Sequence, residues 1–368
     1  MDHIRMPRRR STSVALRCGA ALATFALVLT SCSNDDSTDP SATNQTNQAA
    51  EAMDPIPDRP QPADQVPEQP TRIAIIGYSN NPFFVNVKAG ADAANAVLSQ
   101  YNTTVDWINA GTDIDVPTVN TAVQSAGVQG YDGVGFFIAG DGNCPIIQTL
   151  TDDGVPVGVY NAEIECVEGS GGVIDYSQDS YAAGMNSAKE LLAALDGKGG
   201  KVGIITNLFT SPSNEKRRQG FIDGLEGSNV TVVSDGVEAH DSASETSTAA
   251  KNYMQSTPDL VAIYCTAGGP FGAAEAVKAA GKQDEIKVIG YDITKENLAA
   301  LRDGSLYGVT GQDAFGQGYN VAITLYNVIA TGEMPDEVNV AAAAPFVTLD
   351  NLDDHDPDTQ PLGTVGTS

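Results

Sequence analysis

The chain has 368 residues, of which 41% are apolar, and it carries a formal charge of −27. This length and composition allow two globular lobes, each with its own hydrophobic core. A negative charge of this size argues against a protein that binds DNA, RNA or anionic lipid surfaces through electrostatic attraction.

Residues 1–32 have the features of an export signal. The basic cluster Arg8–Arg10 precedes an apolar run, Ala20–Leu29, which is too short to span a bilayer comfortably. Leu29-Thr30-Ser31-Cys32 then resembles a bacterial lipobox, in which the cysteine becomes the lipidated first residue. The alternative is an ordinary cleaved signal, in which Cys32 has no role.

The two segments that flank the globular part have few apolar residues. Residues 33–71 are rich in Asn, Asp, Gln, Ser, Thr and Pro. Such a segment cannot bury enough surface to offset its chain entropy, so we expect a disordered tether there. The tail, residues 351–368, is acidic and contains proline, and we expect it to fray.

From residue 72, apolar strand patterns alternate with helical patterns. The first set of strands is expected at 72–77, 104–108, 133–138, 156–160 and 173–176, with helices at 84–100, 115–128 and 143–153. The second set has strands at 201–206, 230–235, 260–265, 286–291 and 308–312, with helices at 180–195, 213–226, 242–256, 269–281 and 294–303. A helix at 314–331 and a strand at 341–349 follow. Repeated strand–helix units predict parallel sheets, and two successive sets predict two similar α/β lobes.

Three cysteines lie beyond Cys32. Cys144 and Cys166 follow consecutive predicted strands at the same edge of the sheet, and thiols oxidise outside the cytoplasm. We therefore expect a Cys144–Cys166 disulfide, with free thiols as the alternative. Cys265 ends a strand and is expected to be a buried small side chain. The chain lacks the Cys-x-x-Cys and Cys–His spacings of metal sites, so no metal is expected.

Polar and aromatic side chains gather directly after the predicted strands, at the edge where open parallel sheets bind ligands. They include Asn81, Phe83, Phe84 and Asn161 in the first lobe, and Arg217, His240, Asp241, Asp292 and Gln312 in or beside the second. If the two edges face each other, these residues converge on one cleft.

Several motifs occur in an order that is typical of one family. They are Asn80-Asn81-Pro82-Phe83-Phe84, Val155-Pro156-Val157, Arg217-x-x-Gly220-Phe221, Ala276-Val277-Lys278-Ala279-Ala280-Gly281, Val288-Ile289-Gly290-Tyr291-Asp292 and Gln312. Across residues 72–348 the chain resembles the ribose/galactose-type periplasmic sugar-binding proteins, which are the substrate-binding components of ABC transporters.

The resemblance implies the type I periplasmic-binding-protein fold, with two Rossmann-like lobes of parallel sheets joined by three hinge crossings. The crossings are expected near Tyr176–Gln178, Gly311–Asp313 and Pro335–Val338. The N-terminal lobe would then hold residues 72–176 and 312–335, and the C-terminal lobe residues 177–311 and 336–350.

The resemblance also implies roles for the cleft residues. Asn81 is expected to bond sugar hydroxyls, and Phe83 and Phe84 to form the pocket wall, with core packing as the alternative for at least one of them. Arg217 would donate to sugar hydroxyls, or else form a surface ion pair. Asp292 would accept from hydroxyls, or else cap the following helix.

Other positions differ from the pattern of the family. Ribose binders usually carry Asp-Arg where this chain has Asn161-Ala162, and an aromatic residue where it has His240. Asn161 remains a candidate for ligand contact, whereas His240 either contacts the ligand or is an exposed loop histidine. Gln312 is expected to lie at the hinge and the ligand together.

No enzyme motif accompanies this arrangement. A Gly-x-Ser-x-Gly elbow is absent, and Gly197–Lys201 precedes a strand rather than a helix, so it is interpreted as a turn and not a phosphate loop. The acidic residues around Asp354 lack the Gly and Glu of a calcium loop. The sequence therefore predicts a binding protein rather than an enzyme, without a cofactor.

The prediction is a monomeric, lipid-anchored substrate-binding protein of an ABC importer. It would hold a sugar or a related polyhydroxylated solute and dock on a membrane permease, at the outer face of the bacterial membrane or in the periplasm. No nucleic acid partner is expected. The alternatives are a sensory protein that presents its ligand to a membrane receptor, and a secreted hydrolase with the same fold.

Overall fold

The computed structural model describes residues 52–79, 81–111, 114–161, 164–267, 269–358 and 360–364. The predicted export signal, Cys32 and residues 33–51 of the expected tether lie outside these residues. The described residues form one compact unit, which contains both predicted lobes. No helix in the described part of the chain combines the length and the apolar character needed to cross a membrane.

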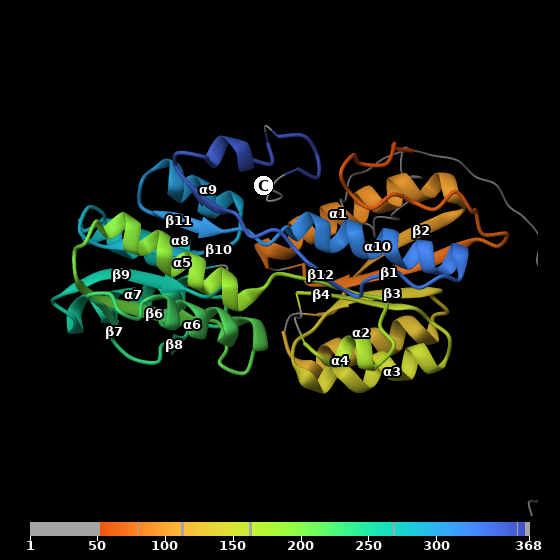
Figure 1. Ribbon diagram of the computed structural model, residues 1–368, viewed down its shortest axis with the longest axis horizontal. Coiled ribbons are helices and arrows are strands. Elements are labelled where there is room, and N and C mark those ends of the chain that lie inside the picture. Colours follow the sequence, from red (N-terminus) through yellow and green to blue (C-terminus); the bar gives the residue numbers. More distant parts are fainter. Residues whose placement is uncertain are drawn as a thin grey trace, which may run out of the picture. The chain divides into compact units, whose positions relative to one another are not determined.

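The first lobe is built on a six-stranded sheet with the strand order β12-β5-β4-β3-β1-β2. The strands are β1 (Thr71–Gly77), β2 (Thr103–Asn109), β3 (Gly133–Phe137), β4 (Val157–Tyr160), β5 (Ile174–Ser177) and β12 (Asn339–Ala341), and all are parallel. Helices α1 (Pro82–Leu98) and α10 (Ala314–Thr331) cover one face, and α2 (Val116–Val128), α3 (Cys144–Asp152) and α4 (Cys166–Gly169) cover the other (Figure 1). Because both faces are covered, the central strands are continuously apolar, as the sequence predicted.

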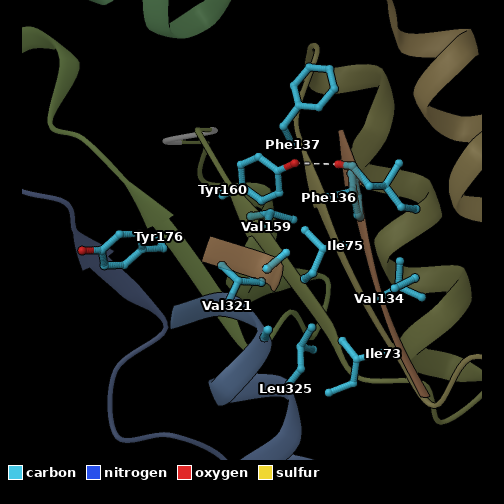
Figure 2. Packing of buried hydrophobic residues seen from close by; sticks show 14 of the residues in the cluster. Ile73, Ile75, Val134, Phe136, Phe137, Val159, Tyr160, Tyr176, Val321 and Leu325 are labelled. Atoms are coloured by element: carbon cyan, nitrogen blue, oxygen red, sulfur yellow. Dashed lines mark hydrogen bonds between the residues drawn. The ribbon is translucent and has the colours of Figure 1, made fainter. Parts of the chain in front are cut away.

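Glycines in β3 and β4 bring helix α10 onto the first sheet. A Cβ at Gly135 would lie 2.6 Å from Ile75 and 2.9 Å from Val321 of α10, so only glycine leaves room there. Figure 2 shows Val321 and Leu325 of α10 packed against the sheet residues Ile73 and Ile75. Tyr160 donates its hydroxyl to the Ile76 carbonyl at 2.6 Å, which satisfies the polar end of a fully buried side chain.

The second lobe has a sheet with the strand order β13-β11-β10-β9-β6-β7, and β8 also pairs with β6. Its strands are β6 (Gly200–Thr206), β7 (Val230–Val232), β8 (Val237–Glu238), β9 (Leu260–Cys265), β10 (Lys287–Tyr291), β11 (Gly308–Thr310) and β13 (Phe346–Thr348), and only β13 is antiparallel to its neighbour. One core cluster packs against α5 (Ser180–Leu195) and α6 (Pro212–Gly224), and another against α7 (Ala243–Ser256), α8 (Pro270–Ala279) and α9 (Lys295–Arg302).

The chain passes between the two lobes three times, at residues 178–179, 311–313 and 342–345. The first two crossings confirm the prediction, but the third prediction, near Pro335–Val338, is wrong. Strand β12 pairs with β5 in the first sheet, with Asn339 opposite Asp175, so the chain leaves the first lobe only after Ala341. The expected strand at 341–349 is in fact divided between the two sheets.

The described parts of the two terminal segments pack on the lobes, unlike the expected tether and frayed tail. Ile56 is buried in the core of the first lobe, and its amide donates to the Tyr319 hydroxyl at 3.2 Å. In the tail, Leu352 joins the core of the second lobe, and Arg302 of α9 pairs with Asp356. A few well-placed residues thus order segments that are polar on average.

The expected disulfide is present. Cys144 begins α3 and is bonded to Cys166, which begins α4, across a sequence separation of 22 residues. Cys265 is a free, buried cysteine, as its place at the end of a strand predicted.

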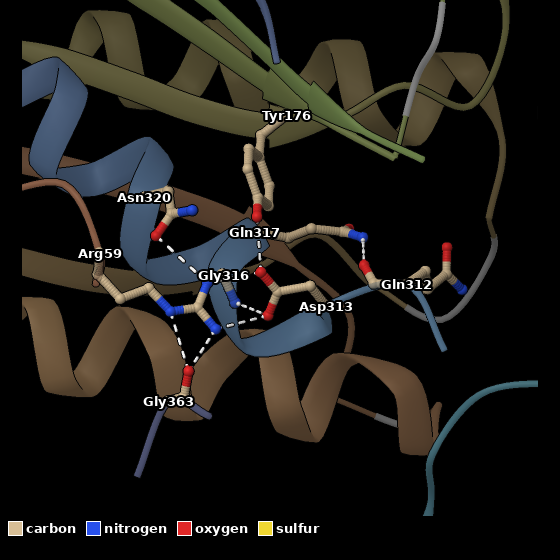
Figure 3. Close-up of polar contacts among 8 residues, drawn as sticks. All are labelled: Arg59, Tyr176, Gln312, Asp313, Gly316, Gln317, Asn320 and Gly363. Atoms are coloured by element: carbon tan, nitrogen blue, oxygen red, sulfur yellow. Dashed lines mark hydrogen bonds and ion pairs between the residues drawn. The ribbon is translucent and has the colours of Figure 1, made fainter. Parts of the chain in front are cut away.

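A buried ion pair occupies the hinge (Figure 3). Asp313, in the second crossing, accepts from both terminal nitrogens of Arg59, one of them at 2.7 Å, and from the Tyr176 hydroxyl at 2.6 Å. Arg59 also donates to the Gly363 carbonyl at 2.6 and 3.0 Å. Burial and the charge of Asp313 raise the pKa of Tyr176, which keeps its hydroxyl a donor. The cluster therefore joins the second crossing and strand β5, which leads into the first crossing, to both terminal segments.

Each lobe also contains a pair of helices that touch through glycines. An added Cβ at Gly90 of α1 would overlap the Phe315 carbonyl of α10. In the second lobe, a Cβ at Gly184 of α5 would overlap the Arg217 carbonyl of α6, and one at Gly220 would overlap the Tyr181 carbonyl. The position of Arg217 is thus set by this close approach of two backbones.

We predict that Gly184→Ala lowers the free energy of unfolding by about 1–3 kcal/mol, because the added methyl group must push α5 away from α6. Urea denaturation followed by circular dichroism measures the change. Gly169→Ala is the matched control, since nothing lies within 4 Å of a Cβ there. Equal stability of the two variants would contradict the glycine contact.

We predict that Arg59→Met lowers the free energy of unfolding by about 3–5 kcal/mol, since it leaves the Asp313 carboxylate buried without its cation. The double variant Arg59→Met/Asp313→Asn should recover part of this loss. In the same denaturation experiment, Lys88→Met, which breaks the exposed Lys88–Asp92 pair, should change stability by only about 0.5 kcal/mol. A single variant as stable as wild type would show that the hinge does not depend on this ion pair.

Candidate functional site

A cavity of about 70 Å3 lies between the lobes, at the carboxyl ends of both sheets. Its lining consists of Asn81, Phe83, Phe84, Ile114, Phe137, Ile138, Ala139 and Asn161 from the first lobe, Asn207, Leu208, Ser211, Ser213, Asn214, Arg217, Asp241, Ala267 and Asp292 from the second, and Gln312 from a crossing. All the predicted site residues except His240 are in this lining.

Asn81 serves as a helix cap and also faces the cleft. Its side-chain oxygen accepts from the Phe83 amide at 2.9 Å and caps α1, which begins at Pro82. The cap does not use the amide nitrogen of the same side chain. This nitrogen donates to Asp241 of the other lobe at 3.2 Å. The cap therefore fixes the direction in which Asn81 presents a hydrogen-bond donor.

Phe83 and Phe84 line the cavity and pack in the core at once. The two rings meet edge to face with centroids 5.1 Å apart, and Phe84 contacts Tyr78 and Phe137 in the same way at 5.5 and 5.2 Å. The two side chains are buried, so both interpretations from the sequence, pocket wall and core, apply to them.

Arg217 is a buried cleft residue rather than part of a surface ion pair, and only 3% of it is exposed. Its terminal nitrogens donate to the Gln312 side-chain oxygen at 2.7 Å and to the Thr266 carbonyl at 3.1 Å. The guanidinium lies 4.1 Å from the centroid of the Tyr291 ring. Its Nε is buried without a hydrogen-bond partner within the described residues.

Asp292 follows β10 with a left-handed backbone, at φ 79°, and accepts from the Gln312 amide. It does not cap α9, because Thr294 does so by accepting from the Asn297 amide at 3.3 Å. Burial raises the pKa of Asp292, against the opposing effects of the Arg217 charge and the Gln312 hydrogen bond.

His240 does not line the cavity. Its imidazole is 56% exposed, and Nδ1 donates to Glu245 at 2.9 Å, a hydrogen bond that raises the pKa of His240. His240 is thus an exposed loop histidine. The following residue, Asp241, lines the cavity and accepts from Asn207 at 3.0 Å as well as from Asn81.

Several residues at the cleft have left-handed backbones without being glycine. Asn161, Asp241 and Asp292 have φ angles of 54°, 53° and 79°. Such conformations are unfavourable for residues with a Cβ and persist where the surrounding structure enforces them. They place these side chains at the cavity, and Asn or Asp directly after a strand is the sequence feature that could identify them.

The cleft offers hydrogen-bond donors and acceptors beside aromatic faces. Within the described ranges, no group of three or more His, Cys, Asp or Glu side chains could hold a metal ion. The arrangement suits a small polar solute that is held from both lobes by hydrogen bonds.

Comparison with known proteins identifies the family of the chain. A family model described as "Periplasmic binding protein domain" matches residues 73–334. The D-ribose/D-allose-binding protein of Pseudomonas aeruginosa is 26% identical over 283 residues, covering 74% of this chain and 86% of that protein. A ribose import binding protein of Bacillus subtilis is 26% identical over 250 residues, covering 63% and 73%.

Solved structures share the fold. A glucose-galactose binding protein from Geobacillus stearothermophilus superposes with a TM-score of 0.68 at 20% identity, over 77% of this chain and 99% of that one. A solute-binding protein from Burkholderia graminis in complex with D-arabinose gives 0.70 at 19% identity, over 78% and 98%. The chain belongs to the periplasmic binding protein family, with the type I fold that its sequence predicted.

Proposed function

We propose that this protein binds a sugar or a related small polyhydroxylated solute in the interlobe cleft, as the substrate-binding component of an ABC importer. The observation that carries the proposal is the placement of Arg217, Asp292 and Gln312 opposite Asn81 and Phe83 around one cavity. The relatives named for ribose and allose, and the neighbour solved with D-arabinose, support a sugar as the class of ligand.

The chemistry of the cleft fits a sugar ring. Ring C–H groups pack on aromatic faces such as those of Phe83 and Phe84, and each hydroxyl needs a donor and an acceptor when it is buried. Arg217 supplies donors, Asp292 supplies acceptors, and the amides of Asn81, Asn161 and Gln312 supply both. None of these roles includes a catalytic step, so the proposal is a binding protein and not an enzyme.

Binding is proposed to favour a closed arrangement of the lobes, because both walls contribute contacts only when they approach each other. The three crossings are the segments that allow such a rotation. The closed form would then be recognised by a membrane permease, with the protein acting as a monomer.

The protein is also proposed to be exported and held at the cell envelope by a lipid on Cys32. The lipobox-like sequence before Cys32 and the polar segment after it support this anchor. A tethered binding domain at the outer face of the membrane, or in the periplasm, stays near its permease.

We predict that a thermal-shift screen of monosaccharides, inositols and nucleosides identifies at least one sugar that raises the melting temperature. A ligand at 100 times its Kd stabilises a protein by about 2.7 kcal/mol. Arg217→Ala and Asp292→Ala should each lower the affinity for that sugar roughly 10–100-fold, as expected for the loss of hydrogen bonds to charged groups. Isothermal titration calorimetry measures the change.

The control is Arg218→Ala, since Arg218 is the next residue of α6 but pairs with Glu215 and does not line the cavity. It should bind the sugar as wild type does. Unchanged affinity in both cleft variants would contradict the proposed site, and no response of the folded protein to any compound would contradict the sugar class.

We predict that the mature protein purified from its native membrane begins at a lipidated Cys32. Intact-mass spectrometry should show the added acyl mass, and Cys32→Ser should release the protein from the membrane fraction. An unmodified N-terminus at Ser33 or later would contradict the anchor, without affecting the proposed ligand.

A further inference from the structure

Asp241 occupies a place in the cleft that the sequence motifs do not assign. It lines the cavity from the second lobe and faces Asn81 of the first. One carboxylate oxygen accepts from the Asn81 amide at 3.2 Å and from the Asn207 amide at 3.0 Å. Asn207 belongs to the same lobe as Asp241, so it orients the carboxylate, whereas the contact to Asn81 crosses the cleft.

The loop that carries Asp241 is fixed on both sides. The Ala239 amide donates to the Thr206 carbonyl at 2.8 Å, and the Ser242 amide donates to the Ala239 carbonyl at 2.7 Å. His240 and Asp241 have successive left-handed backbones, with φ angles of 47° and 53°. Such conformations are unfavourable for residues with a Cβ, so the surrounding contacts must hold them. They direct Asp241 into the cleft, whereas His240 faces solvent.

The charges around the cavity are unequal. Among its described lining residues, Asp241 and Asp292 are acidic and Arg217 alone is basic. The terminal nitrogens of Arg217 are already engaged by Gln312 and the Thr266 carbonyl. A solute with a carboxylate or phosphate would therefore meet two carboxylates in a buried setting, where like-charge contacts are costly.

The Asn81–Asp241 pair also has the right polarity for a hydroxyl group. A hydroxyl inserted between the two side chains accepts from the Asn81 amide and donates to the Asp241 carboxylate, so both groups keep a partner. An ammonium group would satisfy Asp241 but leave the Asn81 amide unpaired, and a carboxylate would do the reverse. The pair thus matches a neutral hydroxyl better than either charged group.

We propose that Asp241 contacts the bound solute, where a hydroxyl replaces its hydrogen bond to Asn81, and that it makes the cleft selective for neutral over acidic sugars. This inference rests on the proposed sugar-binding function and adds to it the charge class of the ligand and a specificity-determining residue.

The test uses the neutral sugar that gives the largest thermal shift, together with its uronic acid and its series of monodeoxy analogues. Isothermal titration calorimetry compares wild type with Asp241→Asn and Asp241→Ala. Asp284→Asn is the control, because Asp284 is an exposed aspartate of the second lobe outside the cavity lining. Circular dichroism verifies that each variant is folded.

Asp241→Ala should lower the affinity for the neutral sugar at least 10-fold, and Asp284→Asn should leave this affinity unchanged. One monodeoxy analogue should bind wild type weakly yet lose no further affinity in Asp241→Ala, which identifies the bridging hydroxyl. In Asp241→Asn the preference for the neutral sugar over its uronic acid should fall by about 10-fold, since removal of the charge removes the repulsion.

An Asp241→Ala variant that binds the neutral sugar as tightly as wild type, or more tightly, would overturn this inference and leave the proposed function intact. In that case, the Asn81–Asp241 hydrogen bond would only connect the two lobes when the cleft holds no ligand. If folded wild type binds no sugar at all, the proposed function fails and this inference fails with it.

Discussion

The structure depends on the buried ion pair between Arg59 and Asp313, because it is placed where the chain changes lobes. Asp313 is the N-cap of α10, and its carboxylate accepts from the Gly316 amide as well as from Arg59 and Tyr176. A buried carboxylate with so many donors has few alternative positions. Its contacts therefore fix the direction in which α10 leaves the crossing, and with it the first lobe.

Some features of the cleft lower the stability of the folded state. Because burial raises the pKa of Asp292, the unfolded chain loses this proton at a lower pH than the folded chain does. Below the ordinary value of 3.8 both states are protonated and the penalty is absent, and as the pH rises above that value the folded state loses stability relative to the unfolded one. Together with the left-handed residues at the cleft, this penalty is the kind that proteins retain at binding sites.

The sequence predicted what depends on repeated local patterns. The helix 314–331 and the disulfide were found, since apolar periodicity and strand order determine them. The sequence placed both His240 and Asp241 near the cleft, but it did not show that only Asp241 lines the cavity, because two adjacent loop residues are distinguished only by their backbone angles. The sequence also did not predict that the described parts of the terminal segments pack on the lobes. Composition averages over many residues, whereas a few residues such as Arg59 and Ile56 make the contacts.

Gln312 links the hinge to the cleft within a single residue. Its backbone carbonyl accepts from the Gln317 side chain of α10 at 2.8 Å, which ties it to the first lobe (Figure 3). Its side chain joins Arg217 and Asp292 of the second lobe. Any rotation about residues 311–313 must therefore change the position of the Gln312 amide relative to these two charged groups. In the proposed function, a solute bound between the charged groups and Asn81 would act on the same geometry, so this one side chain would couple the hinge angle to the occupancy of the cleft.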